Sequence, residues 1–528
     1  MIMRKFAAVA LLSSVMTSPP VSADAPESAQ QLWREFSNAP TQRHSHLPDF
    51  SWAGYGYGER EIPEPDVVAN VREHGAVGDG QADDTEAFRS AIAAAKDAGG
   101  GAVLVPHGRY RLTGVIHLDA SDIVLRGEGV GRSTLFFERP LEDAVQKLTD
   151  GTGQSRWSWS GGLLWVGPDN TFDDAGRLRS TGGYERWGDT EDIGPVAETA
   201  EQGAFEITLD ESTAGRLSPG DLVLINYHDP PDHSLLEFIG GHELMKQADW
   251  NRLAGTTFRW PVEIETVEGR TITLRKPLRL PVRRQWNVKL TTPGPHIREV
   301  GIEHLTVLFP RTQLASHNRY PGYNGIYVQK AVHCWVRDVL IVNADNGILT
   351  TSIANCTFSD FTLSGRGHHH GTYSKDTHDV LFDLFRLQAE SYHGINCEGL
   401  ASGVVWRRGR IDHGTFDSHR NMPFDLLREH IRINSRGRPG GASSAGPFAG
   451  RRVVHWNVLM TGGSADWVAC PDYMPNGALV GVRGTDIRRT DHPWAMPPGD
   501  KGCIVVDHGR VPNPPSLYDA QLQRRLRQ

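Results

Sequence analysis

Cysteine and long apolar runs are both scarce in this 528-residue chain. Its five cysteines are too few for a disulfide scaffold, and none has the Cys-x-x-Cys spacing of structural zinc sites. The odd number leaves at least one thiol free, and Cys470 and Cys503 are the candidates for a bridge. No stretch of about 18 or more apolar residues occurs, so the sequence predicts no transmembrane helix and no membrane partner.

A positive net charge is missing as well. The formal net charge of -8 argues against nucleic acid as the main partner. The charge is unevenly placed, because residues 301–460 hold 17 Arg and Lys against 13 Asp and Glu, together with 12 of the 23 histidines. We expect this segment to attract an anionic ligand, more strongly at mildly acid pH.

The N-terminus has the pattern of a secretory signal peptide. A basic start at Arg4 and Lys5 precedes an uncharged run from Phe6 to Met16 and small residues up to Ala23. We expect residues 1–23 to be removed and the protein to be secreted or periplasmic. Residues 24–70 are expected to form an N-terminal arm, and residues 511–528 a short helical tail.

The segment 71–140 begins the regular structure. Asp83 and Asp84 can start a helix that runs to the glycines at 99–101, and short alternating strands follow. The strings GAVGDGQADDTEAF, GGGAVLVPHGRY and IVLRGEG resemble the opening of pectate-lyase-like, right-handed parallel β-helix proteins. The resemblance covers residues 71–137 and implies an all-β solenoid capped by this helix, on which the two aspartates are structural.

A sequence repeat supports the solenoid independently of this resemblance. The apolar pattern begins at Ile302, Val336, Phe358, Phe382, Trp406 and Val453. The four central copies start 22, 24 and 24 residues apart, and the last follows after 47. A period in the low twenties matches one coil of a parallel β-helix, so residues 301–510 are predicted to form the main solenoid.

Residues 141–300 break this rhythm. They hold seven of the fourteen tryptophans and end in a strand-like segment. We expect an inserted small β subdomain that lies against one face of the solenoid, with most of the tryptophans in a core.

The repeat also predicts where polar residues gather. Asn346, His370, His393 and Asp417 lie 10 to 12 residues after successive pattern starts. Equal offsets stack into a column along one face of a solenoid, with about 4.8 Å between coils. These four residues are therefore expected to form one polar strip.

The residue types on this strip suit proton transfer. Histidine ordinarily titrates near neutral pH, so His370 and His393 are expected to transfer protons, and Tyr373 or Lys375 could act as a second acid or base. The resemblance implies a polysaccharide lyase, which removes the proton beside a uronate carboxylate after a cation has neutralised that carboxylate. The predicted catalytic residues are His370, His393, Tyr373, Asp417, His419 and Arg420, and the predicted substrate-binding residues are Asn346, Arg366, Lys375, His413 and Arg428.

Two other functions stay open. A glycoside hydrolase on the same fold would need two carboxylic acids, for which the candidates are Asp412, Asp417, Asp376 and Asp379. The polygalacturonase pattern is missing, since the solenoid contains no Asn-Thr-Asp and no Gly-His-Gly. A non-catalytic glycan-binding solenoid is the second alternative, although the density of His and Arg between 366 and 432 argues against it.

The sequence gives no firm metal site. His368, His370, Asp376 and His378 lie close in sequence, but nothing fixes a shared geometry. Calcium bound by Asp412 or Asp417 is an alternative that the resemblance implies. We therefore expect an acidic polysaccharide as the partner, with no committed cofactor.

Overall fold

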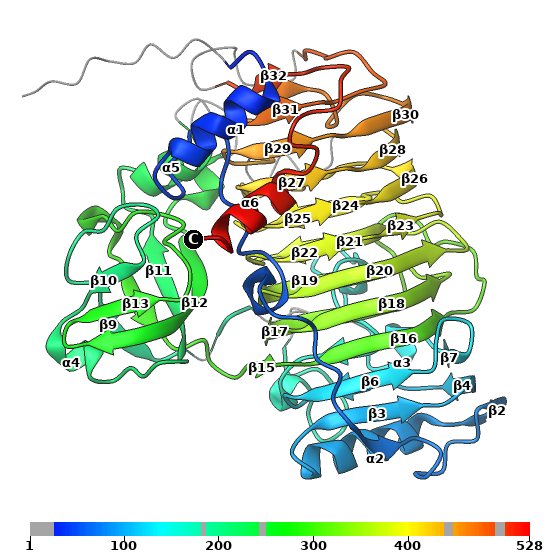
Figure 1. Cartoon of the computed structure of the whole chain (residues 1–528). Coiled ribbons are helices and arrows are strands. Elements are labelled where there is room, and N and C mark those ends of the chain that lie inside the picture. Colours follow the sequence, from blue (N-terminus) through cyan, green and yellow to red (C-terminus); the bar gives the residue numbers. More distant parts are fainter. Residues whose placement is uncertain (1–25, 181–185, 189, 242–249, 438–446, 491–501) are drawn as a thin grey trace, which may run out of the picture.

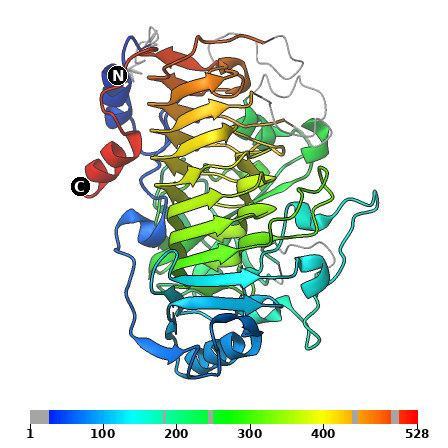
Figure 2. The ribbon, with the colours of Figure 1, turned by 90° about the vertical axis from the view of Figure 1, so that its right-hand side faces the viewer.

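The computed structural model describes residues 26–180, 186–188, 190–241, 250–437, 447–490 and 502–528. The chain winds into a tall stack of coils whose strands run parallel from coil to coil (Figure 1; Figure 2). The parallel β-helix predicted from the sequence is confirmed. The expected signal peptide lies outside the described residues.

The larger sheet of the coil holds 19 strands in the part of the chain that is described. Each strand pairs in parallel with the equivalent strand of the next coil. Its strands are β1 Val67–Asn70, β2 Asp79–Asp83, β3 Gly101–Val105, β4 Gly108–Leu112, β6 Ile123–Gly127, β7 Ser133–Phe137, β16 Gly301–Leu308, β18 Trp335–Val342, β20 Thr357–Ser364, β22 Leu381–Asp383, β23 Arg386–Leu387, β25 Val405–Arg407, β26 Arg410–Gly414, β27 Leu426–Glu429, β28 Arg432–Ser435, β29 Val453–Trp456, β30 Leu459–Gly463, β31 Ala478–Val480 and β32 Ile504–Val506.

A second parallel sheet of seven strands, counted over the same described ranges, forms another face of the coil. It carries the histidine-rich segment on β21 and its neighbours. Its strands are β5 Ile116–Leu118, β8 Leu164–Val166, β15 Ile297–Arg298, β17 Asn324–Val332, β19 Asn346–Ala354, β21 His370–Lys375 and β24 Ile395–Glu398.

Inward-facing side chains stack from coil to coil as the repeat predicts. Val336 pairs in register with Phe358, Phe358 with Phe382, and Phe382 with Trp406. The Phe358 and Phe382 rings are stacked at 4.9 Å, and those of Phe382 and Trp406 at 5.5 Å. Because each coil buries its apolar residues against the next, the core is continuous along the stack.

The next position in this inward row is polar. Trp406 pairs in register with Arg428, and Arg428 pairs with His455. Both side chains are fully buried. The coil therefore continues past Trp406 with two polar residues in an interior row that is otherwise apolar.

The expected insertion is present but is not continuous. Strand β8, inside the predicted range 141–300, belongs to the coil because it pairs with both β5 and β17. The separate subdomain starts later, and it is a six-stranded antiparallel sheet beside the coil (Figure 1). Its strands are β9 Asp192–Pro195, β10 Glu206–Thr208, β11 Leu222–His228, β12 Thr257–Glu268, β13 Thr271–Leu274 and β14 Lys289–Thr291.

Buried ion pairs join this subdomain to the coil. Lys276 Nζ lies 2.6 Å from Asp379 Oδ2, and Arg279 also donates to Asp379. Arg279 reaches Asp425 at 3.1 Å, and Arg452 pairs with the same Asp425 at 2.7 Å. All five side chains are buried, so each charge depends on its partners for compensation.

Helices cover the first coil and one flank. Helix α2 packs against β1, β3 and β5 as the predicted cap, while the Asp84 carboxylate accepts from the amides of Val77 and Gly78 and closes the preceding loop. Helices α1 and α6 lie against the upper coils (Figure 2). The helices are α1 Ala29–Asn38, α2 Thr85–Asp97, α3 Leu141–Ala144, α4 Glu211–Ala214, α5 Ser234–Gly240 and α6 Leu517–Arg525, and the 3-10 turns are η1 Tyr55–Gly58, η2 Arg156–Ser158, η3 Asp169–Thr171, η5 Trp250–Leu253, η6 Arg284–Trp286 and η8 Pro471–Tyr473.

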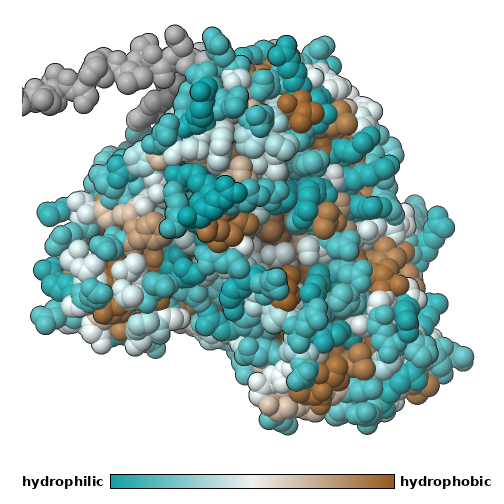
Figure 3. All heavy atoms as spheres, viewed as in Figure 1, coloured by the Kyte–Doolittle hydropathy of each residue, from teal (hydrophilic) through white to brown (hydrophobic). Residues whose placement is uncertain are grey.

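The face drawn in Figure 3 is mostly hydrophilic, with its hydrophobic residues in small separate groups. Within the described ranges no helix is long and apolar enough to cross a membrane. All five cysteines are free, so the candidate Cys470–Cys503 bridge is not formed.

Candidate active site

A cleft of about 380 Å³ opens beside strands β21 and β24. Two loops far apart in the sequence form its walls, at residues 150–159 and 317–318. It is lined by Asp150, Gln154, Arg156, Trp159, His317, Asn318, His369, His370, Tyr373, His393, Glu398, His419 and Arg420. Five of the six predicted catalytic residues are in this lining, and the sixth, Asp417, contacts two of them, His393 and His419.

A larger hollow of about 580 Å³ lies elsewhere, between the N-terminal arm and the insertion. Its lining includes Arg43, Phe238 and Arg283 but neither histidine nor tyrosine. The smaller cleft, by contrast, is lined by five histidines and a tyrosine, which are residue types that can transfer protons.

Strand register brings the charged groups of the cleft together. Lys375 on β21 pairs in register with Glu398 on β24, and Glu398 pairs with Arg420 on the next coil. Tyr373 precedes Lys375 by two residues, so both side chains leave the strand on the same side. Three successive coils thus contribute to one polar cluster.

Glu398 is the centre of this cluster. Its carboxylate lies 3.1 Å from Lys375 Nζ, accepts a 3.0 Å hydrogen bond from Arg420 Nε and accepts another from the Tyr373 hydroxyl. Burial opposes ionisation of Glu398, yet the nearby Lys375 and Arg420 charges hold its pKa well below the ordinary value. Glu398 is therefore an anion at neutral pH. Glu398 was not among the site residues predicted from the sequence. The signal that could have identified it is its position one coil after Lys375.

His393 and Asp417 form a second buried pair. His393 Nδ1 lies 2.6 Å from Asp417 Oδ2, and His419 Nδ1 lies 3.5 Å from the same oxygen. Burial would raise the pKa of Asp417, but the bonds to the two histidines lower it to about 2. Burial lowers the pKa of His393 although Asp417 opposes this shift. At neutral pH His393 is a neutral ring that donates Nδ1–H to Asp417, so Nε2 carries the lone pair.

Three imidazole rings are packed side by side at the cleft floor. The ring centroids of His369 and His370 are 4.1 Å apart, and those of His370 and His393 are 4.7 Å apart with near-parallel planes. Burial and the neighbouring histidines lower the pKa of His369 and of His370 well below the ordinary value. The predicted stacking of His370 on His393 is present, and the rings are neutral because cations so close together would repel.

Two predicted substrate contacts are wrong because the side chains are buried. Arg428 points into the coil, where it donates to the Asp417 carbonyl at 2.8 Å and lies 3.2 Å from His455 Nε2. Asn346 is also fully buried and donates to the Asn324 side chain at 2.8 Å. Neither can touch a polymer, so their roles are to hold the coil.

The other predicted contacts lie outside the cleft lining. Arg366 pairs with Asp345 at 2.6 Å, and the side chains of both residues are largely buried. Lys375 is almost fully buried, and its ammonium group contacts Glu398 without lining the cleft. His413 is exposed on β26, in the other sheet, 3.2 Å from Asn434.

The carboxylates considered for hydrolysis do not converge. Asp379 is held by Lys276 and Arg279 at the subdomain junction. Asp412 pairs with the exposed Arg410 at 2.7 Å, outside the cleft. Asp376 pairs with Arg186 at 2.8 Å and lines a different pocket. Among these four residues, Asp417 is the one with an ion pair to a residue of the cleft lining, so they do not assemble the two-carboxylate arrangement of a hydrolase.

Calcium does not fit the donor set of the cleft. Calcium takes about six to eight oxygen ligands. The Glu398 carboxylate is surrounded by two cations and a phenol, and the Asp417 carboxylate by two histidines. In the described chain, the groups of potential metal ligands are rich in histidine instead, and His368, Asp376 and His378 belong to neither of them.

The fold and a family model define the class of protein. Residues 68–175 match the model described as rhamnogalacturonase A/epimerase, pectate lyase-like. Residues 391–528, which include His393, Glu398 and Asp417, match a domain of unknown function, DUF4955. The chain is thus a pectate-lyase-like parallel β-helix protein.

Curated relatives match short parts of the chain. Mannuronan C5-epimerase AlgE1 from Azotobacter vinelandii is 30% identical over 158 residues, covering 29% of this chain and 11% of the relative. Alginate lyase 7 from the same organism is 39% identical over 72 residues, covering 12% and 8%. The chain therefore spans about a tenth of the length of these relatives.

Solved structures are similar along most of the chain but at low identity. The tailspike protein gp49 from Pseudomonas phage LKA1 has a TM-score of 0.49 at 15% identity, covering 79% of this chain and 64% of the tailspike. The A-module of mannuronan C-5 epimerase AlgE4 from Azotobacter vinelandii has a TM-score of 0.36 at 13% identity, covering 84% and 95%.

Proposed function

We propose that the protein is an enzyme that cleaves a uronic-acid polysaccharide by β-elimination in this cleft. One observation carries the proposal: the neutral His393 ring, oriented by Asp417, lines the same cleft as the Tyr373 phenol and the Arg420 guanidinium. A base, an acid and a cation are the three groups that this reaction requires.

The cleft can receive the substrate carboxylate. Arg156 and Arg420 bring two guanidinium groups to its lining, and planar guanidinium groups suit carboxylate oxygens. When cations compensate the charge of the carboxylate, the pKa of the adjacent C5–H falls. The reason is that the negative charge left on C5 can then delocalise into the carboxylate group. Electrostatic stabilisation of this kind is usually the largest contribution to such a step.

Proton transfer then needs two groups with opposite protonation states. His393 Nε2 takes the C5 proton, the electron pair forms the C4–C5 double bond, and the C4–O4 bond breaks. Tyr373, whose hydroxyl carries its proton in a bond to Glu398, gives a proton to the departing oxygen. The products are an unsaturated uronate at the new non-reducing end and a free hydroxyl on the other fragment.

The relatives support the substrate class. One is named an alginate lyase and several are named mannuronan C5-epimerases. C5 epimerisation is the second candidate, since it begins with the same removal of the C5 proton. It then keeps the C4–O4 bond and returns a proton to C5 from the opposite face of the ring. The expected partner in both cases is an acidic polysaccharide.

The test is incubation of the full chain with alginate, pectate, glucuronan and glycosaminoglycans. β-Elimination produces ultraviolet-absorbing unsaturated ends in step with new reducing ends. Epimerisation produces neither but incorporates deuterium at C5 in heavy water, and hydrolysis produces reducing ends without absorbance. Retention on a glycan column with none of these changes would indicate a binding protein.

Matched variants connect the activity to the cleft. His393→Gln removes the base, whereas His413→Gln removes an exposed histidine in the other sheet. The first is expected to abolish product formation and the second to leave it unchanged. Full activity of His393→Gln on every substrate would overturn this assignment.

We also propose that the protein is exported, because the pattern of residues 1–23 is that of a signal peptide. N-terminal sequencing of the protein recovered from periplasm or medium should then begin at Asp24. Recovery from the cytosol with Met1 intact would contradict export.

A further inference from the structure

Two buried imidazoles present the same ring nitrogen to the cleft. His369 Nδ1 is 2.8 Å from the Ser158 carbonyl oxygen, and His393 Nδ1 is 2.6 Å from Asp417 Oδ2. Both partners are acceptors, so both Nδ1 atoms carry hydrogen and both Nε2 atoms carry a lone pair. His369 Nε2 is buried, and no hydrogen-bond partner for it lies among the described residues. A buried lone pair in this position can accept a hydrogen bond or bind a metal ion.

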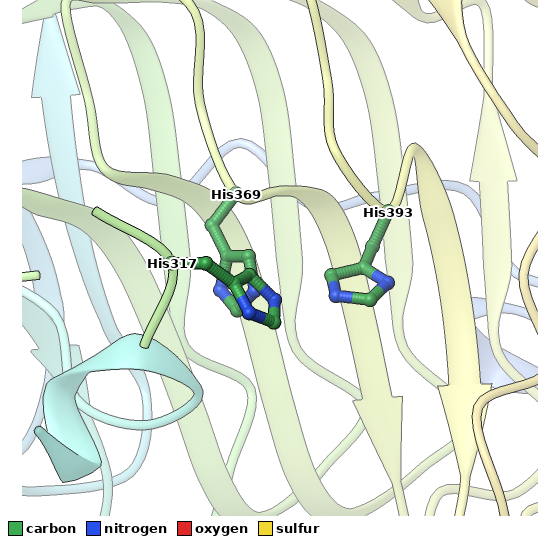
Figure 4. Close-up of side chains that lie close together, drawn as sticks. All are labelled: His317, His369 and His393. Carbon is green, nitrogen blue, oxygen red and sulfur yellow. The ribbon is translucent and has the colours of Figure 1, made fainter. Parts of the chain in front are cut away.

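A third histidine reaches the same place from a loop. The His317 ring centroid is 5.0 Å from that of His369 and 5.8 Å from that of His393. The candidate ligand nitrogens of the three residues all lie within 4.8 Å of one another. Figure 4 shows the His317 and His369 rings together, with the His393 ring pointing toward them.

We propose that His317, His369 and His393 bind one divalent transition-metal ion of the zinc type. Imidazole nitrogens are ordinary ligands of such ions, and three protein ligands with an open fourth position is a recurrent arrangement. Tetrahedral coordination requires nitrogens about 3.3 Å apart. The candidate nitrogens now lie within 4.8 Å of one another. His317 is exposed on its loop, so its side chain can move inward until the nitrogens reach the tetrahedral spacing.

The surroundings of the two buried ligands match those of metal-bound histidines. Such histidines almost always donate their other ring N–H to a carboxylate or a backbone carbonyl. Asp417 provides the carboxylate and Ser158 the carbonyl. These bonds orient both rings before any metal arrives, and the fourth position would face the cleft that Arg156 and Arg420 line.

Metal binding has a consequence that rests on the proposed function. A lone pair of His393 that is bound to a metal cannot accept the C5 proton. A zinc ion at this site is therefore an inhibitor of the elimination proposed above, because it competes with the substrate proton for the same nitrogen.

Calorimetric titration with zinc chloride tests the site directly, using the full chain after treatment with a chelator and dialysis. We expect one ion per chain in the natural protein and in His413→Ala, and binding at least ~100-fold weaker in His317→Ala. Cobalt(II) bound at the same site should give the visible spectrum of a tetrahedral nitrogen-ligated ion. No binding, or equal binding by His317→Ala with an unchanged melting temperature, would overturn the proposal.

Rates of polysaccharide cleavage with and without zinc test the inhibition separately from metal binding. Because His317 lines the cleft, the rate of each protein is compared with its own metal-free rate. Zinc should lower this ratio in the natural protein and leave it near one in His317→Ala. Activation by zinc, or equal inhibition of both proteins, would overturn the inhibitory role. If none of the polysaccharides is cleaved, the titration still decides whether the three histidines bind the metal.

Discussion

Asp417 accepts the Nδ1–H of His393 at 2.6 Å, and this contact decides which nitrogen of the ring faces the cleft. The two residues lie on neighbouring coils, 24 positions apart in the sequence. Asp417 is fully buried, so its charge persists because His393 and His419 surround the carboxylate. The pair therefore fixes a neutral, correctly oriented base before substrate binds.

Asp417→Asn tests this orientation. The amide has the same shape but can donate a hydrogen bond to Nδ1, which would stabilise the tautomer with hydrogen on Nε2. We expect kcat for elimination to fall by about 100- to 10,000-fold while KM changes little. Product absorbance measures the rate, and the melting temperature serves as the control for folding. An unchanged kcat would show that His393 needs no partner.

Tyr373→Phe tests the acid. The substitution removes only the hydroxyl that donates to Glu398. We expect kcat to fall by about 100-fold or more, because the leaving oxygen then has to find its proton in water. Tyr392→Phe is the matched control, since Tyr392 packs against the His393 ring at 4.8 Å but is assigned no proton transfer. Equal losses in both variants would argue for a packing effect instead.

Much of the architecture follows from periodicity in the sequence. Each coil of a β-helix repeats the same inward positions, so the apolar pattern at Val336, Phe358, Phe382 and Trp406 predicts their stacking correctly. The same counting places His370 next to His393. Such predictions succeed because the coil length translates sequence distance into a position on the stack.

The other residues of the site depend on contacts that the length of the sequence repeat does not predict. Arg428 occupies an inward position that apolar residues fill on earlier coils, so its charge suggested a surface residue. Glu398 carries no motif and becomes recognisable only through its register with Lys375 and Arg420. Arg156 and His317 enter the cleft from loops outside the repeat.

Arg428→Met is expected to destabilise the upper coils. Burial lowers the pKa of Arg428 to about 10, so the group is still charged at neutral pH. Its guanidinium donates to the Asp417 carbonyl and to the Ser418 hydroxyl, and methionine would leave both acceptors buried without a donor. We expect the free energy of unfolding to fall by about 2–4 kcal/mol in urea titrations. Arg410→Met, at an exposed ion pair, should change it by less than ~1 kcal/mol.

Asp379→Asn is expected to loosen the inserted subdomain. The change leaves Lys276 and Arg279 with a weaker partner in a buried junction. Removing one member of a buried ion pair costs about 3–5 kcal/mol because the other charge stays uncompensated. Limited proteolysis should then cut within residues 192–291 sooner than in the natural protein. Asp412→Asn, which affects an exposed pair, should leave the cleavage pattern unchanged.

Acid stability should depend on His455. Its Nδ1 is 2.9 Å from the Val468 carbonyl oxygen and its Nε2 faces Arg428, so the buried ring is neutral. Burial, together with the Arg428 charge, lowers the pKa of His455 from 6.5 to about 3.

The unfolded chain therefore binds one more proton at His455 than the folded chain between these two pKa values. The stability associated with this group is complete above pH 6.5 and is lost as the pH falls toward about 3, with a slope of about 1.4 kcal/mol per pH unit. His455→Gln should lower stability at pH 7 but flatten this slope in urea titrations. His508→Gln, at an exposed site, should retain it. Equal slopes in all three proteins would mean that His455 is already protonated in the folded state, next to Arg428.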